Sequence, residues 1–404
     1  MSQTRADPGN SRGGWPRWAE ARTDAIVAAG QWRSVHAFDA RGPRGTLAPD
    51  AGGPPGGVVT SFASNDYLGL SAHPALATAA VAAIERWGTG SGAARLVVGS
   101  RPGHHELEAA LALWRSTPAA LVLPTGFAAN LAVMSTFGDP GARILSDELN
   151  HASIIDGCRL ARAPVAVYRH ADPEHLARRL AEARADGVDR CLVVTDTVFS
   201  MDGDVAPVAE IAELCRTARA LLVLDEAHAV LGPDLDRGEL DGVEVLRVGT
   251  LSKTLGSLGG FVAGSRRHID LLVNLARPFI FTTAPTPADT AAAQAGLAIL
   301  AGAEGRALKA RLAGHVARLR PGHPSPILPV LVGDEGDAVD LAAELLGEGI
   351  LVPAIRPPTV PPGTSRLRVA LSAAHTDDQI DDLAAALARR GHPIETPASP
   401  AGVR

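Results

Sequence analysis

Between residues 61 and about 300, short apolar runs that suit strands alternate with longer stretches that have the periodicity of helices. Parallel strands need a crossover connection, which is usually a helix. The alternation therefore predicts an α/β fold with a mostly parallel sheet covered by helices on both faces. The predicted strands are residues 119–123, 143–145, 165–168, 191–195, 221–224 and 245–248, and the predicted helices between them include residues 126–137, 173–185 and 208–219.

The rest of the chain divides around this core, since 404 residues exceed the size at which one hydrophobic core keeps growing. We expect residues 1–60 to form an N-terminal arm with an amphipathic segment at residues 17–30, and residues 61–300 to form the large domain. A smaller α+β domain is expected at residues 301–391, before a flexible tail at 392–404. Residues 1–16, rich in glycine, proline and serine, are expected to be frayed. In the small domain the pattern predicts a long helix at 302–320, strands at 327–331, 351–355 and 366–371, and helices at 338–348 and 376–389.

The overall charge and the cysteine pattern exclude several classes of protein. A net charge of −6 provides no basic surface for nucleic acid. The sequence has no apolar run of about 18 residues and no signal-peptide pattern at its start, so neither a membrane partner nor secretion is expected. Three cysteines without paired spacing fit reduced thiols in the cytoplasm, and no metal-binding spacing is found among the histidines.

The chain has only two lysines, Lys253 and Lys309, against thirty-six arginines. A guanidinium stays protonated, whereas a lysine amine can lose its proton and condense with an aldehyde. Lys309 lies in an arginine- and alanine-rich helical pattern, and we expect it on a solvated face. Lys253 lies in a polar turn bounded by glycines, residues 249–256, directly after an apolar run. This position favours a chemical role for Lys253.

Polar residues follow several of the apolar runs at the points where the predicted strands end. Open α/β sheets bind their ligands beyond the carboxyl ends of the strands, so we expect these residues to form one site. They are Thr125, Gly126 and Phe127 after one run, Ser200 after another, Asp225 and His228 after a third, and Lys253 after a fourth.

Asp225 ends an apolar run, and His228 follows three residues later. A buried carboxylate is costly without a cationic partner, and a protonated pyridine nitrogen would be such a partner. An aspartate that caps a helix beside a structural histidine is the other interpretation. The letters Asp-Glu-Ala-His also match helicase-type ATPases, which require a phosphate loop upstream. The nearest match to that loop, residues 249–254, lies downstream and has Ser252 where glycine is needed, so we reject this assignment.

Two further features fit a phosphorylated aromatic cofactor. Gly126 and Phe127 stand at a predicted strand-to-helix turn, where backbone N–H groups can bind phosphate, although many structural crossovers look the same. His151 lies beside small residues that would let its ring lie flat on an aromatic ring, although single histidines are often structural. With Lys253 to form an imine and Asp225 to hold a pyridinium, the set indicates a pyridoxal 5′-phosphate (PLP) site.

Over about residues 20–390, the chain resembles the α-oxoamine synthases, a family of fold-type I PLP enzymes. The resemblance implies a fold-type I PLP-dependent transferase, with the large α/β domain, the small C-terminal α+β domain and the N-terminal arm described above. Residues 355–364 resemble the family member that acts in biotin synthesis. The segments that carry the resemblance are residues 64–70, 88–92 with Arg95 and His104, 125–130, 150–153, 198–204, 225–228, 250–253, 357–361 and 366–368.

For the cofactor, the resemblance implies that Lys253 forms the covalent link to PLP and then acts as the base toward Cα. Asp225 is implied to pair with the pyridinium nitrogen and His151 to stack on the ring. His228 and Ser200 are implied to contact the phenolic oxygen. The residues implied to hold phosphate are Gly126, Phe127 and Thr250, with Thr282 or Thr283 reaching the phosphate bound in the partner subunit of a homodimer.

For the substrates, the resemblance implies decarboxylative condensation of L-alanine with a pimeloyl thioester, carried by coenzyme A or an acyl carrier protein. Arg368 and Asn65 are implied to bind the amino-acid carboxylate, and Arg356 and Thr359 to face the acyl chain. The N-terminal substrate arginine of the family has no clean counterpart, and Arg33 is the nearest residue. Two alternatives remain: another α-oxoamine synthase that uses glycine or serine with a different thioester, and a PLP-binding protein without catalysis.

Overall fold

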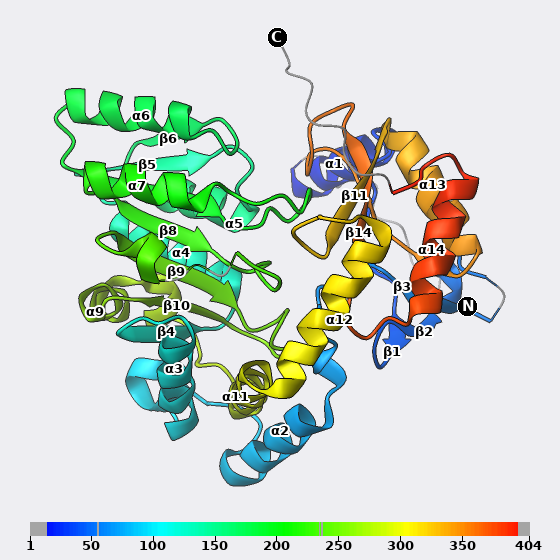
Figure 1. The fold of residues 1–404 in the computed structure, drawn as a ribbon, viewed down its shortest axis with the longest axis horizontal. Helices are drawn as coiled ribbons and strands as arrows, with labels where there is room; N and C mark the ends of the chain where they lie inside the picture. The colour runs from blue at the N-terminus through cyan, green and yellow to red at the C-terminus, as the bar shows by residue number, and fades with distance from the viewer. Residues whose placement is uncertain (1–13, 55, 234, 236, 395–404) are drawn as a thin grey trace, which may run out of the picture.

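The computed structural model describes residues 14–394, apart from residues 55, 234 and 236; the predicted tails at 1–16 and 392–404 lie mostly outside this part. Among the described residues, the central sheet has seven strands in the order β4-β10-β9-β8-β7-β5-β6 (Figure 1). All neighbours are parallel except β10, which is antiparallel to β4 and β9. The strands are β4 (Ala119–Leu123), β5 (Ala142–Asp147), β6 (Val165–Tyr168), β7 (Arg190–Asp196), β8 (Leu221–Asp225), β9 (Glu244–Thr250) and β10 (Gly260–Gly264).

The expected α/β fold with a mostly parallel sheet is confirmed, and β4 and β6 have the predicted bounds. β10 is not among the predicted strands. Its five residues begin and end with glycine, a residue that weakens a strand pattern because it has no side chain to pack.

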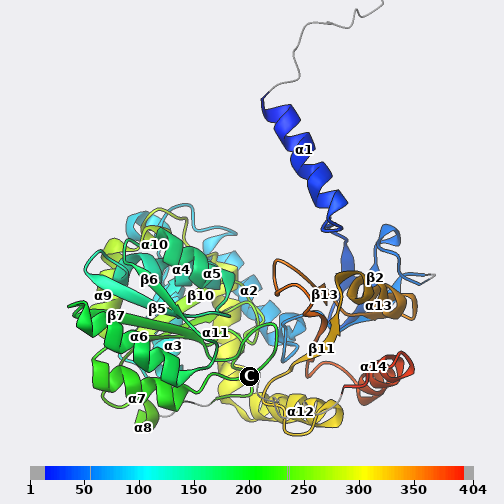
Figure 2. The same cartoon turned by 90° about the horizontal axis from the view of Figure 1, so that it is seen from above.

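Helices cover both faces of the sheet (Figure 2). Alternate residues of a strand point to opposite faces. Val223 of β8 therefore packs with the helices of one face, and Leu222 and Leu224 pack with those of the other. The first face carries α4 (Gly126–Phe137), α5 (Ala152–Leu160), α9 (Arg266–Leu275) and α10 (Arg277–Ile280); the second carries α3 (Pro102–Trp114), α6 (Pro173–Ala185) and α7 (Val208–Ala218).

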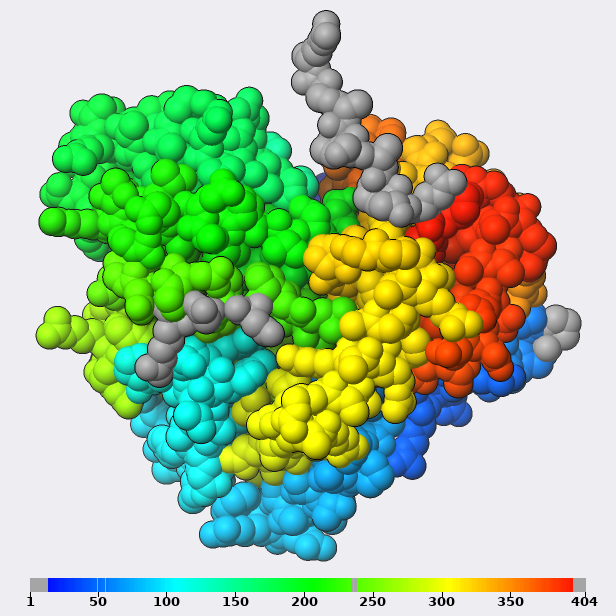
Figure 3. Space-filling model, viewed as in Figure 1, coloured from blue at the N-terminus to red at the C-terminus, as the bar shows by residue number. Residues whose placement is uncertain are grey.

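The C-terminal part contains an antiparallel sheet in the order β11-β14-β13, and α12 (Ala303–Leu319) lies between this part and the large sheet (Figure 3). The predicted long helix at 302–320 is confirmed by α12. The other helices and the strands of the C-terminal part are β11 (Ile327–Gly333), β13 (Ala354–Ile355), β14 (Ser365–Ala370), α13 (Glu335–Gly347) and α14 (Asp377–Arg389). Outside the sheets, the chain also forms α2 (Pro74–Trp87), α8 (Arg237–Leu240), α11 (Pro287–Ala301) and the short helical turns Pro49–Ala51, Leu70–Ala72 and Arg95–Gly99.

The prediction of one strand at residues 351–355 is wrong. This stretch forms β12 (Ile350–Leu351) and β13, which belong to two different sheets. Pro353 separates them because it has no N–H to donate to a ladder, and its carbonyl oxygen instead accepts the N–H of Arg368 at 3.1 Å. β12 joins a second sheet, in the order β1-β2-β3-β12, with β1 (Phe38–Ala40), β2 (Arg44–Leu47) and β3 (Val58–Ser61).

Near the N-terminus, α1 (Trp15–Ala28) projects away from the rest of the molecule (Figure 2). It covers most of the predicted amphipathic segment, and none of its residues is buried. In the part of the chain that the structure describes, no helix combines the length and the apolar character needed to cross a bilayer.

The topology gathers several polar residues at one edge of the central sheet. β9, β8, β7 and β5 are consecutive parallel strands of this sheet, so their carboxyl ends lie along the same edge. Asp196 at the end of β7 is in register with Asp225 at the end of β8, and Asp225 is in register with Val248 of β9. The loop after β9 carries Lys253 to the same edge.

Candidate active site

Lys253 lies in the loop after β9, where its Nζ is 2.7 Å from Nε2 of His228. Burial lowers the pKa of Lys253 to about 8; the positive charge of Arg368 acts in the same direction, and the carboxylates of Asp225 and Asp196 oppose the shift. An ordinary lysine is almost fully protonated at this pH. A large fraction of Lys253 is therefore a free amine in mildly alkaline solution, the form that attacks an aldehyde.

The Asp225 carboxylate is buried at the end of β8. Its Oδ2 accepts a hydrogen bond from Nδ2 of Asn130 at 2.6 Å, and its Oδ1 accepts one from the N–H of Ala227 at 2.9 Å. Neither partner is a cation, and within the described chain Asp225 forms no ion pair. A buried carboxylate without a cation is costly, so this site fits a ligand that brings a positive charge, such as a pyridinium N–H.

His228 connects Lys253 to a chain of polar side chains. Its Nδ1 is 2.6 Å from the Tyr67 hydroxyl, and that hydroxyl donates to Oδ1 of Asn65 at 3.1 Å. Burial, followed by the charges of Lys253 and Arg368, holds the pKa of His228 well below its usual value. The neutral ring can then donate through Nδ1 to Tyr67 and accept from Lys253 through Nε2.

Arg368 continues this chain from the small sheet. Its Nη2 donates to Oδ1 of Asn65 at 3.2 Å, and its Nε donates to the carbonyl oxygen of Ser200. Arg368 is buried on β14, yet its partners are neutral oxygens. An arginine held by carbonyl groups keeps its charge available for a carboxylate, since Arg binds carboxylates through two parallel hydrogen bonds.

His151 caps the start of α5 beside the end of β7. Its Nδ1 is 2.7 Å from Oγ of Ser153, which also accepts a hydrogen bond from Asn130 at 2.9 Å. Its backbone N–H donates to Oδ2 of Asp196 at 2.8 Å. Desolvation by the surrounding protein lowers the pKa of His151, and the charge of Asp225 opposes this. Asn130 thus ties the His151 cap to Asp225.

The N-terminus of α4 forms a possible phosphate cradle. Thr125 caps the helix by accepting the N–H of Ala128 at 3.0 Å, which leaves the N–H groups of Gly126 and Phe127 without a protein acceptor in the described chain. A Cβ at residue 126 would lie 3.2 Å from the Cβ of Thr250, so glycine permits this close approach. Such N–H groups, with a nearby hydroxyl, are typical ligands of phosphate.

Of the residues predicted to meet the acyl substrate, Arg356 contacts the N-terminal arm. Arg356 donates to the carbonyl oxygens of Gly30 and Trp32, the latter at 3.2 Å. The N–H of Thr359 donates to the Arg356 carbonyl at 3.1 Å. Arg356 thus contacts residues 30 and 32, which are close in sequence to Arg33, and Arg33 is itself exposed.

Thr282 and Thr283 follow α10; Thr282 is half-buried, and Thr283 is exposed and pairs with Ala94. Neither residue contacts Lys253, Asp225 or the α4 cradle through a hydrogen bond within the described chain. A role for them at a phosphate group requires a second subunit.

Five residues that complete the site had no predicted role: Tyr67, Asn130, Ser153, Asp196 and Ser252. Tyr67, Asn130, Ser153 and Ser252 fall inside the segments that carry the family resemblance, and Asp196 directly follows the predicted strand 191–195, so position alone could have indicated them. Their partners are as much as 161 residues away in the chain, as for Tyr67 and His228, and only the fold reveals such pairs.

Comparisons with known proteins agree with this geometry. The family model of aminotransferase class I and II matches residues 58–387. An 8-amino-7-oxononanoate synthase from Anaeromyxobacter dehalogenans is 50% identical over 375 residues, which cover 88% of this chain and 93% of the relative. The enzyme of the same name from Geobacter sulfurreducens is 46% identical over 353 residues, covering 83% of this chain and 90% of the relative.

Solved structures give the same picture. A serine palmitoyltransferase from S. paucimobilis with a bound PLP–myriocin aldimine has a TM-score of 0.83 at 28% identity, covering 93% of this chain and 97% of that one. An 8-amino-7-oxononanoate synthase from Francisella tularensis has a TM-score of 0.66 at 25% identity, covering 82% and 98%. The expected fold-type I architecture is confirmed. The chain belongs to the aminotransferase class I and II family and, within it, to the 8-amino-7-oxononanoate synthases.

Proposed function

We propose that this chain condenses L-alanine with a pimeloyl thioester to give 8-amino-7-oxononanoate, carbon dioxide and the free thiol, a step of biotin biosynthesis. One observation carries the proposal: a lysine with a lowered pKa and a buried carboxylate that forms no ion pair within the described chain meet at the carboxyl edge of one sheet. These are the two groups that PLP requires. The identity of up to 50% to enzymes of this name supports the choice of substrates.

When bound, PLP supplies an aldehyde carbon for amino groups and a ring that accepts the electron pair left behind when Cα loses its proton. Lys253 takes the Cα proton from alanine and later returns one, because its amine is partly unprotonated at working pH. Asp225 would hold a proton on the ring nitrogen, and neutral His228 accepts a hydrogen bond from the Lys253 amine. Arg368 and Asn65 would hold the alanine carboxylate, which leaves as carbon dioxide after the new carbon–carbon bond forms.

The choice of amino acid is tested by measuring release of the free thiol with alanine, glycine and serine. A pocket discriminates one methyl group by about 10- to 200-fold. We therefore expect kcat/KM for alanine to exceed that for glycine by at least about tenfold. The serine palmitoyltransferase likeness makes serine with a long-chain thioester the second candidate. A tenfold preference for glycine or serine would exclude alanine as the substrate. If none of the three amino acids supports turnover, the alternative of a PLP-binding protein without catalysis is favoured.

We propose that the acyl chain passes Arg356 and Thr359, with Arg33 near its distal carboxylate, and that its carrier is coenzyme A or an acyl carrier protein. The contacts of Arg356 with residues 30 and 32 support this path, because they place the arm beside the C-terminal part. We also propose a cytoplasmic location, which the three free cysteines support.

We propose a homodimer in which each subunit completes the site of the other. Large apolar side chains that no described part of the same chain covers support this, since monomers rarely expose many of them together. They are Trp15 and Trp18 on α1, Leu96, Val97 and Val98 in the turn before α3, and Phe281 beside Thr282.

A charge placed in this surface should separate the subunits. Val97→Asp would bury an unpaired carboxylate in the dimer, which costs several kcal/mol, so we expect a single-chain species in sedimentation and a loss of turnover. Val97 is 72% exposed within one chain, so the folded monomer should tolerate the change. Leu331→Asp, at a residue 65% exposed on β11, is the matched control and should stay dimeric. A dimeric, fully active Val97→Asp protein would contradict this interface.

A further inference from the structure

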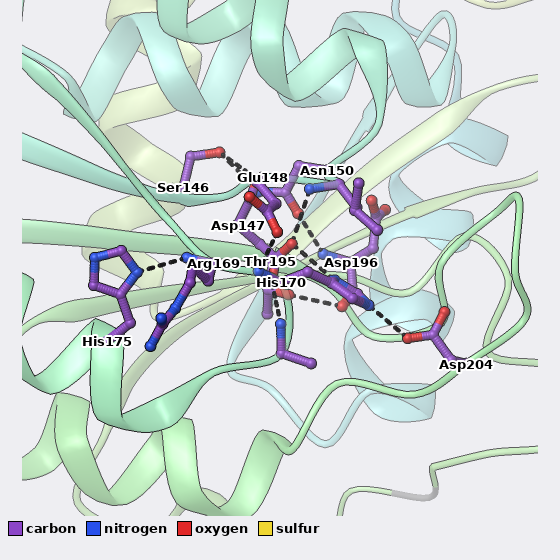
Figure 4. Close-up of polar contacts among 12 residues, drawn as sticks. Ser146, Asp147, Glu148, Asn150, Arg169, His170, His175, Thr195, Asp196 and Asp204 are labelled. Atoms are coloured by element: carbon purple, nitrogen blue, oxygen red, sulfur yellow. Dashed lines mark hydrogen bonds and ion pairs between the residues drawn. The ribbon is translucent and has the colours of Figure 1, made fainter. Parts of the chain in front are cut away.

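His170 lies between two aspartates outside the proposed active site (Figure 4). Its Nδ1 is 3.0 Å from Oδ1 of Asp147, and its Nε2 is 2.7 Å from Oδ2 of Asp204. The three residues come from the loop after β6, the end of β5 and the loop after β7. A neutral imidazole has only one N–H, so two carboxylates are both satisfied only by the charged ring.

The electrostatic balance favours that charged ring. Burial lowers the pKa of His170, but the hydrogen bonds and charges of Asp147 and Asp204 outweigh it and raise the pKa to about 10. His170 is therefore an imidazolium near neutral pH, and both hydrogen bonds are charge-assisted.

On one side, His170 is attached to a rigid anchor. The Asp147 side chain is fully buried, and it also accepts the N–H groups of Leu149 at 2.9 Å and Ala171 at 2.9 Å. The N–H of His170 donates to Glu148 at 2.9 Å. Asp147 therefore fixes the backbone just after β5, at Leu149, and just after β6, at Ala171.

On the other side, His170 holds a loop that reaches the active site. We call residues 198–205 the Ser200 hairpin; Val198 pairs with Val205, and the N–H of Phe199 donates to the Asp204 carbonyl at 3.0 Å. His170 also packs edge-on against the Phe199 ring, with centroids 4.3 Å apart. Oδ1 of Asp204 is buried without a hydrogen bond in the described chain, so His170, which binds Oδ2, provides the one side-chain hydrogen bond that this carboxylate forms among the described residues.

The same hairpin contacts the small sheet. The Ser200 carbonyl accepts Nε of Arg368, Asp202 pairs with Arg366, and the Gly203 carbonyl accepts the Ser325 hydroxyl at 2.7 Å. The hairpin thus stands between His170 and Arg368. A shift of the Ser200 carbonyl would remove the hydrogen bond that orients the Arg368 guanidinium.

We propose that His170 is a positioning residue, which fastens the Ser200 hairpin to the large sheet and thereby orients Arg368 for the amino-acid carboxylate. This inference rests on the proposed function for the identity of the substrate. The contacts of the hairpin do not depend on it.

Two substitutions separate the two hydrogen bonds of His170. In His170→Asn the side-chain amide takes the place of Nδ1 and keeps the contact with Asp147, but it is too short for Asp204. In His170→Gln the amide takes the place of Nε2 and keeps the contact with Asp204. His175→Asn is the matched control, because the His175 ring accepts the N–H of Arg169 and forms no hydrogen bond with the hairpin within the described chain.

The first readout is amide hydrogen exchange of the peptide spanning the hairpin, measured on the full chain. We expect exchange in His170→Asn to be about 10- to 100-fold faster, the range for losing one charge-assisted hydrogen bond. His175→Asn should exchange as the wild type does, and His170→Gln, which keeps a hydrogen bond to Asp204 without the charge of the ring, should exchange more slowly than His170→Asn. Asp204→Asn serves as a second variant and should accelerate exchange in the same direction, because it removes the charge and keeps the shape.

The second readout is steady-state kinetics with alanine. A misplaced binding group raises KM for the group it binds, so we expect His170→Asn to raise KM for alanine about tenfold, with a smaller change in kcat. Unchanged exchange in both His170→Asn and Asp204→Asn would overturn the proposal, and so would equal effects of His170→Asn and His170→Gln. If the wild type itself releases no thiol with any amino acid, the proposed function fails, while hydrogen exchange still decides the role of His170 at the hairpin.

Discussion

Replacing Lys253 with alanine is expected to abolish thiol release from the acyl donor. A positioned proton-transfer group contributes about 10²–10⁴-fold to the rate, and this lysine is also the nucleophile toward the cofactor aldehyde. We therefore expect kcat to fall by at least about 10³-fold, measured as thiol released in the presence of alanine. The matched control is Lys309→Ala, which changes the other lysine of the chain, on α12, and should leave the rate unchanged.

The same prediction can be checked without turnover. Borohydride reduction of the wild-type protein with PLP should attach the reduced cofactor, as a covalent label, to the peptide that contains Lys253. The Lys253→Ala protein should remain unlabelled. A label on Lys309, or a Lys253→Ala protein that turns over at the wild-type rate, would exclude the proposed mechanism.

Much of this site could be predicted because parallel strands end at the same edge. Asp225 and Lys253 each follow an apolar run, and the strand order brings those runs together as neighbours β8 and β9. The main chemical groups thus lie at strand ends, and a strand end is visible in the sequence as an apolar run followed directly by a polar residue.

The supporting contacts could not be predicted in the same way, because they depend on which distant loops meet. His170 contacts Asp147 and Asp204, which are 23 and 34 residues away, and no local spacing relates them. Arg368 reaches Ser200 across 168 residues and two sheets. Likewise, the break between β12 and β13 follows from Pro353, but the separate sheets that they join follow from the packing of β3.

Asp225 and Asp196 end neighbouring strands in register, yet they should respond differently to the same substitution. Burial, followed by the charge of Asp225, raises the pKa of Asp196 well above its usual value, which favours the uncharged carboxyl, a group that asparagine resembles in shape and charge. In Asp196→Asn the oxygen can still accept the N–H of His151, and we expect a loss of no more than about fivefold, equivalent to about 1 kcal/mol.

Asp225→Asn, in contrast, should lower kcat by at least about 10²-fold, the usual effect of removing one preorganised charge from an active site. The fold should accept the change. Asparagine at 225 can still accept the N–H of Ala227, and Asn130, whose Oδ1 has no partner in the described chain, can turn its amide to accept from the new N–H. Thermal unfolding would check that stability is retained, and thiol release would measure kcat. Similar losses in Asp225→Asn and Asp196→Asn would mean that the charge at 225 is not the group that serves the cofactor ring.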